Sequence, residues 1–180
     1  LNVVQVREPN APEGQPAVEW RLVTNLPIDT REQVAAVVDH YRARWQIEEY
    51  FKAIKTGCGF CKRQATSLDA LVRVLALLIP TAWRLLALRW TSRNDPDAPA
   101  STVLLASEIE CIHALRPKLK ILTARDACLA VAALGGHLKS NGPPGWQVLG
   151  RGFEHRTDMR LGFLAARRSR SPSTGEERRM

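Results

Sequence analysis

The stretch YRARWQIEEYFKAIKTG, residues 41–57, carries a tyrosine, an arginine, a glutamate and a lysine at intervals of three, four and seven residues: Tyr41, Arg44, Glu48 and Lys55. Because an α-helix turns about 100° per residue, these intervals place the four side chains within a sector of roughly 60°. Lys52 joins the same stripe, about 20° beyond this sector. A helix over this stretch would hold one carboxylate between cations and a tyrosine on a single face.

Two interpretations of this stripe compete. A carboxylate flanked by cations suits a site that seats a hard metal ion beside phosphates, because Mg²⁺ prefers oxygen ligands and phosphates bind Lys and Arg. The same spacing is also typical of surface helices, on which Arg–Glu–Lys ladders stabilise by about 0.2–0.5 kcal/mol per pair. Spacing alone favours the surface ladder, so the identity and order of the residues must decide.

The pattern Tyr-x2-Arg-x3-Glu-x6-Lys resembles the signature of bacterial insertion-sequence DDE transposases of the cut-and-paste type, whose RNase H-like core carries a β-rich insertion. Five neighbours are also in register with that signature: Trp45, Glu49, Lys52, Thr56 and Gly57. The resemblance extends from about residue 3 to about residue 168 and weakens after residue 95.

This resemblance implies that Glu48 is the third carboxylate of a catalytic triad, which would share two divalent ions, Mg²⁺ or Mn²⁺, with two aspartates. Tyr41, Arg44 and Lys55 would hold the phosphates of transposon-end DNA, and Lys52 lies on the same stripe. The connector FCKRQAT, residues 60–66, adds Arg63 as a further candidate for phosphate contact. A solvated basic loop is the other interpretation of that connector.

Two tryptophans gain a role from the same resemblance. In family members that cut through a DNA hairpin, a base flips out and stacks on a tryptophan. Trp20 lies at the matching position, 21 residues before Tyr41, and Trp45 would lie beside the gap that the base leaves. Without the family, Trp20 is better explained as a core or sheet-face residue.

The two aspartates of such a triad are missing from the expected places. The chain contains Asp29, Asp39, Asp69, Asp95, Asp97, Asp126 and Asp158. All except Asp29 follow the last expected strand, and Asp29 lies in the turn TNLPIDT. A single carboxylate holds Mg²⁺ poorly. We therefore expect the C-terminal part of a transposase that is inactive alone and binds its metal ions only in the complete enzyme.

Charge and composition agree with a DNA partner. The chain has 180 residues, a net charge of +8 and 45% hydrophobic residues, with a sequence pI near 9.9. Such a balance is typical of a globular chain with a polyanionic partner. Charge does not identify a transposase, because basic proteins bind nucleic acid non-specifically.

The four cysteines and the apolar stretch 68–90 indicate in which cellular compartment the chain is expected. Cys58 and Cys61 form a CxxC, but Cys111 and Cys128 make no second pair, so free thiols are favoured over zinc. Reduced thiols and the lack of a visible signal peptide fit a cytoplasmic, nucleoid-associated protein. The most apolar run, 68–90, contains three arginines, which argue against a membrane span.

Outward from the stripe, the sequence predicts a mostly α fold with a short β-hairpin. The expected elements are strands over 2–8 and 18–26 and helices over 31–55, 103–115, 123–134 and 146–168, with a linker over 91–102. The apolar run 68–90 is expected to form either a buried helix pair or one helix kinked at Pro80. We expect residues 1–95 to be the C-terminal part of an RNase H-like core, residues 96–168 an all-helical dimerisation domain, and residues 169–180 a disordered tail.

The last helix has an unusual composition. Gly150, Gly152 and Gly162 each cost up to about 1 kcal/mol relative to alanine, so packing must support this helix. By resemblance it pairs two transposase subunits across two DNA ends; ordinary packing within the chain is the alternative.

Three functions therefore remain in competition. The chain is a transposase fragment for cut-and-paste transposition, a non-catalytic remnant that binds DNA, dimerises with intact transposase and inhibits it, or a basic DNA-binding module unconnected with recombination. Only the first two account for the Tyr-Arg-Glu-Lys register.

Overall fold

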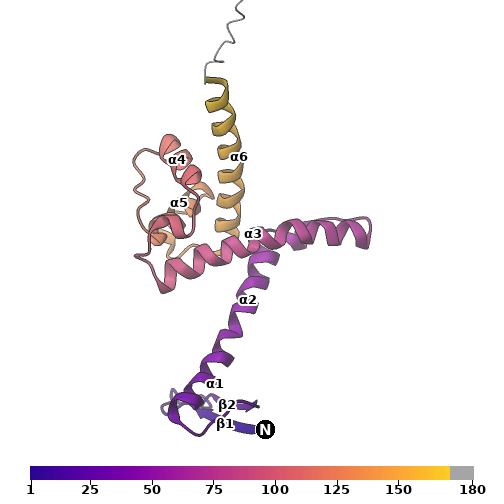
Figure 1. Ribbon diagram of the computed structural model, residues 1–180, viewed down its shortest axis with the longest axis vertical. Coiled ribbons are helices and arrows are strands. Elements are labelled where there is room, and N and C mark those ends of the chain that lie inside the picture. The colour runs from indigo at the N-terminus through magenta and orange to yellow at the C-terminus, as the bar shows by residue number, and fades with distance from the viewer. Residues whose placement is uncertain (171–180) are drawn as a thin grey trace, which may run out of the picture. The chain divides into compact units, whose positions relative to one another are not determined.

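The structure, a computed structural model, describes residues 1–170 (Figure 1). The chain divides into two compact units, Leu1–Glu49 and Tyr50–Met180, and the boundary falls within one helix. The fold is mostly helical with one two-stranded sheet, which confirms that part of the predicted fold class. The RNase H-like assignment stays a prediction.

The first unit is a hairpin covered by a helix. Strands β1 (Asn2–Arg7) and β2 (Glu19–Thr24) pair antiparallel, as the alternating sequence predicts, with Val4 opposite Leu22. These two side chains and Val37 of α1 (Arg31–Ala43) form a small buried core. Trp20 and Tyr41 pack against this core from its edge.

The predicted single helix over 31–55 is interrupted twice. Thr30 caps α1, and its side chain forms a capping box with Gln33. At Arg44 the helix tightens, because the Arg44 amide donates to the Tyr41 carbonyl and the Ile47 amide to the Arg44 carbonyl. After α2 (Trp45–Lys52), the π-helical turn η1 (Ala53–Gly57) follows, closed by the Cys58 amide on the Ala53 carbonyl at 2.8 Å. The uniform 100° spacing assumed for Lys55 therefore does not hold.

The second unit is helical throughout its described part. Its elements are η2 (Phe60–Lys62), α3 (Leu68–Asn94), η3 (Ala100–Thr102), α4 (Ala106–Leu115), α5 (Ala124–Leu134), η4 (Lys139–Asn141) and α6 (Trp146–Arg170). Figure 1 shows α4 and α5 beside α6, with α3 running across their base. One continuous core joins η1, α3, α5 and α6; Leu85, Leu88, Val131 and Leu149 are fully buried in it.

The predicted linker over 91–102 is packed rather than open. α3 continues to Asn94, and Ala100 and Leu104 are buried. The Ala100 amide donates to the Leu122 carbonyl at 2.9 Å, and the Ala124 amide to the Ala98 carbonyl at 2.7 Å. Proline, serine and aspartate here mark turns, and the core of the second unit includes residues on both sides of residue 95. The predicted domain boundary stays a prediction.

α3 is long and apolar enough to cross a membrane by length and composition, and 17% of its most apolar window is buried. A core helix of a soluble protein passes the same test. Two of its arginines are engaged within the unit, since Arg84 pairs with Glu108 and Arg89 donates to the Pro144 carbonyl. The chain continues as helix through Pro80.

The end of the chain differs in part from prediction. Ser169 and Arg170 belong to α6, where the Ser169 hydroxyl donates to the Ala166 carbonyl. The remainder of the predicted tail, residues 171–180, lies outside the described residues.

Candidate nucleic-acid interface

Arg44 is the centre of the predicted stripe in the first unit. Its Nη1 atom lies 3.3 Å from Oε1 of Glu48, one helical turn on. Its guanidinium lies 5.7 Å from the ring centroid of Tyr41 and 5.5 Å from that of Trp45. Three of the residues that the sequence selects therefore surround a fourth, and Arg44 and Glu48 remain about half exposed.

The two predicted tryptophans have different environments. Trp20 is half-buried, and its ring lies edge-on to Tyr41 with centroids 5.0 Å apart and an interplanar angle of 61°. Trp45 is 54% exposed, so its ring is accessible from solvent. The hairpin thus supports Tyr41 through Trp20, while Trp45 presents an aromatic surface next to Arg44.

A cavity of about 440 Å³ opens beside this cluster in the first unit. Its lining includes Arg21 and His40 in addition to Tyr41 and Arg44. Sequence reasoning missed Arg21 and His40, although the alternation of β2 could have placed Arg21 on one face of the hairpin. Two arginines, a histidine and a phenol around one hollow can receive an anion.

The other predicted cations belong to the second unit. Lys52 and Lys55 are exposed, and the Lys55 ammonium lies 6.0 Å from the Phe51 ring centroid. Arg63 is within 3.5 Å of Glu154 on α6 and lines a cavity of about 270 Å³ with Arg151. Arg63 is thus partly neutralised by Glu154.

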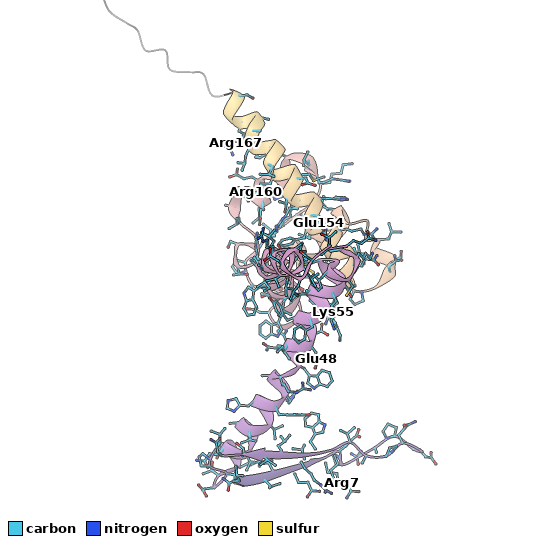
Figure 2. All side chains as sticks on the ribbon, turned by 90° about the vertical axis from the view of Figure 1, so that its right-hand side faces the viewer. Arg7, Glu48, Lys55, Glu154, Arg160 and Arg167 are labelled. Atoms are coloured by element: carbon cyan, nitrogen blue, oxygen red, sulfur yellow. The ribbon has the colours of Figure 1, made fainter. Side chains whose placement is uncertain are left out.

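The stretch of α6 that follows Glu154 is tied to α4. Arg160 Nε donates to the Ser107 hydroxyl at 3.1 Å, and Arg167 Nη1 donates to Glu110 at 2.8 Å (Figure 2). The packing that the glycines of α6 require lies earlier in the helix, where Gly150 packs on the Gly57 backbone and Gly152 on the Val131 backbone.

The Glu48 carboxylate by itself does not make a magnesium site. It pairs with a cation, the guanidinium of Arg44. Among residues 1–170 no three histidine, cysteine, aspartate or glutamate side chains lie close enough to hold a metal ion. Because Mg²⁺ needs several oxygen ligands, the described residues do not fit a complete two-metal centre.

The cysteines are free thiols. Cys58, Cys111 and Cys128 are buried and Cys61 is exposed. Burial, with a smaller contribution from Glu154 and against the opposing effect of Arg63, raises the pKa of the Cys58 thiol to about 11. A thiol that resists ionisation is a poor zinc ligand and a poor nucleophile.

A family model described as the transposase DDE domain matches residues 5–95. The match begins in β1 and ends just after α3, so it includes Trp20, the Arg44 cluster and the whole stretch 41–57. It covers half of the chain, and the Tyr41–Arg44–Glu48 geometry lies inside it. The chain belongs to the family of transposases with a DDE domain.

Proposed function

We propose that this chain acts in DNA transposition as the C-terminal part of a bacterial insertion-sequence transposase of the cut-and-paste type, and that it binds transposon-end DNA. The observation that carries the proposal is the Arg44 cluster inside the family match, where one guanidinium contacts a carboxylate and two aromatic rings.

The cluster suits DNA rather than a small apolar ligand. Arginine binds phosphate oxygens through paired N–H groups and stacks on aromatic faces, and both kinds of contact serve nucleic acid. Glu48 holds the Arg44 guanidinium in place, and the exposed Trp45 ring offers a surface on which a base can stack. Lys52, Lys55 and Arg63 are among the cations that give the chain its net charge of +8.

We assign Glu48 as the third carboxylate of a DDE site for Mg²⁺ or Mn²⁺. No group of three metal-ligating side chains forms there among the described residues, so the chain needs further acidic ligands before it can cleave DNA. On this proposal residues 1–95 belong to an RNase H-like core, residues 96–168 pair two subunits on DNA, and the protein works in the bacterial cytoplasm at the nucleoid.

Fluorescence anisotropy with a labelled duplex carrying the element's terminal repeat tests this function. We expect wild type to prefer this duplex over a shuffled sequence, and Arg44→Gln to lose most of the preference. Arg42→Gln is the matched control, because Arg42 is an exposed arginine that pairs only with Asp39 among the described residues. Equal affinity of wild type for the end and shuffled duplexes would support a general DNA-binding module instead.

The isolated carboxylate also supports a non-catalytic function. A chain that binds ends and pairs with intact transposase, but cannot cleave, would inhibit transposition as a mixed dimer. Co-expression with tagged full-length enzyme should recover both chains together. Recovery of the tagged enzyme alone would exclude this mode of inhibition.

A further inference from the structure

A basic pocket of about 400 Å³ lies in the second unit, away from the Arg44 cluster in sequence. Its wall contains three arginines, one histidine, one serine and one cysteine: Arg89, Arg93, Arg125, His137, Ser92 and Cys128. No carboxylate of a described residue lines it. We call it the Arg89 pocket. A cavity with several cations and no acidic lining points to an anion.

One face of α3 and one face of α5 form two walls of the pocket. Arg89, Ser92 and Arg93 follow the spacing i, i+3, i+4 on α3, which places them on one face. Arg125 and Cys128 stand one turn apart on α5. The loop over 142–144 forms a further wall, entered through Gly142 at φ +71°, a conformation that favours glycine.

Arg89 is held in one position in this pocket. Its Nη1 atom donates to the Pro144 carbonyl at 2.7 Å, and its guanidinium lies 4.6 Å from the ring centroid of the buried Trp146. Because the loop and the tryptophan fix the guanidinium, binding an anion there would cost little side-chain entropy.

His137, Arg93 and Arg125 have nitrogen atoms that remain available to bind an anion. The Nε2 atom of His137 is buried and has no hydrogen-bond partner among the described residues. A buried ring nitrogen without a partner is unfavourable unless a ligand or water completes it. Arg93 and Arg125 are exposed and make no ion pair with any described residue.

We propose that the Arg89 pocket binds a phosphate group, with Arg93 and Arg125 gripping its oxygens, Arg89 supplying positive charge behind them and His137 Nε2 completing the contacts. Phosphate fits because its oxygens accept several charge-assisted hydrogen bonds at once, and guanidinium groups match that geometry. The phosphate belongs either to a DNA backbone or to a free phosphate ion. The site does not depend on the proposed function, since binding of a free ion requires no transposon DNA.

The test uses the full chain and inorganic phosphate, measured by isothermal titration calorimetry at constant ionic strength. Wild type is expected to bind, and the double variant Arg93→Gln/Arg125→Gln to bind about tenfold more weakly or not at all. Both side chains are exposed, so the variant should fold, and circular dichroism checks that it does. Arg7→Gln/Arg31→Gln is the control, with the same loss of charge at exposed positions in the first unit.

A second arm separates the two sources of phosphate by repeating the comparison with a random duplex. If the pocket variant weakens both phosphate and duplex binding, the natural ligand is a DNA phosphodiester; if it weakens phosphate binding alone, the ligand is a free anion. Absence of phosphate binding by wild type, or equal binding by the pocket variant, would overturn the proposal. Failure of the chain to bind any DNA would overturn the proposed function while leaving the calorimetric result to stand on its own.

Discussion

Oε2 of Glu108 lies 3.1 Å from Nη1 of Arg156, and the two side chains are 1% and 2% exposed. Arg84 Nη2 donates to both oxygens of the same carboxylate, at 3.1 and 2.9 Å, and the Leu105 amide donates to it at 2.9 Å. One carboxylate therefore joins α3, α4 and α6. Burial lowers the pKa of Arg156 to about 10, although Glu108 opposes this shift.

Replacing Glu108 should destabilise the second unit strongly. Glu108→Gln keeps the shape of the side chain but leaves the buried guanidinium of Arg156 without its counter-charge. This should lower the free energy of unfolding by about 3–5 kcal/mol. Urea unfolding followed by circular dichroism measures this loss. Glu110→Gln is the control on the same helix, because Glu110 pairs at the surface and should cost less than about 1 kcal/mol. Equal losses in the two variants would contradict the assigned role of the buried pair.

The α6 glycines should respond oppositely to alanine. A Cβ at Gly150 would collide with the Gly57 backbone, so Gly150→Ala must displace α6 or η1 and should cost several kcal/mol, at about the level of severe overpacking. Gly162 has nothing within 4 Å of such an atom, so Gly162→Ala should stabilise by about 0.5–1 kcal/mol. Thermal unfolding of both variants gives the comparison. A stabilised Gly150→Ala would mean that α6 does not contact η1 this closely.

Cys58 should make stability depend on alkaline pH. Its folded pKa, about 11, exceeds the ordinary thiol value of 9.0, so the protonated form favours folding. This contribution is fully present below about pH 9 and is lost as pH rises through about 11. The stability gap between wild type and Cys58→Ala should therefore narrow over that range, measured by urea midpoints. Cys61→Ala removes an exposed thiol, so its difference in stability from wild type should not change with pH. A difference for Cys58→Ala that stays constant between pH 9 and pH 11 would contradict the raised pKa of Cys58.

Arg44 should account for about one phosphate contact. If it binds DNA, Arg44→Gln should reduce the slope of log affinity against log salt by about one, because one fewer counterion is released. Anisotropy titrations at several salt concentrations give this slope. Arg42→Gln should leave it unchanged, and an unchanged slope for Arg44→Gln would place the phosphates elsewhere.

Nicking of supercoiled plasmid in Mn²⁺ tests the incomplete metal site. Neither wild type nor Glu48→Ala should nick, because no three metal-ligating side chains lie together among residues 1–170. A complete transposase with its acidic ligands is the positive control. Nicking by wild type that disappears in Glu48→Ala would show a working metal site in this chain.

Local rules predicted the local structure well. The hairpin follows from the β-type composition of NVVQVR and the alternation in EWRLVT, and the structure shows side-chain caps at Thr30, Ser67 and Thr123, close to three of the expected helix starts. Each of these signals lies within a few residues of the structure that it specifies.

What the sequence did not reveal depends on distant partners. Glu108 meets Arg84 and Arg156, which lie 24 and 48 residues away, so no helical periodicity connects them. The predicted linker packs because Ala100 and Leu122 pair their backbones. Arg44 illustrates the intermediate case: its i, i+4 pairing with Glu48 was predictable, whereas the hollow shared with Arg21 required the hairpin to fold beside it.

The close approach of Gly57 to Gly150 has a consequence for genetics. Lys55 stands in the π-helical turn that Gly57 ends, and the α6 backbone presses on that turn at Gly150. A random-mutagenesis screen for lost DNA binding should therefore recover substitutions at Gly150, nearly a hundred positions from the lysine in the sequence. Second-site suppressors of such alleles should replace a large side chain beside the π-helical turn, such as Leu85, with a smaller one. Substitutions that add positive charge at the surface should not suppress them.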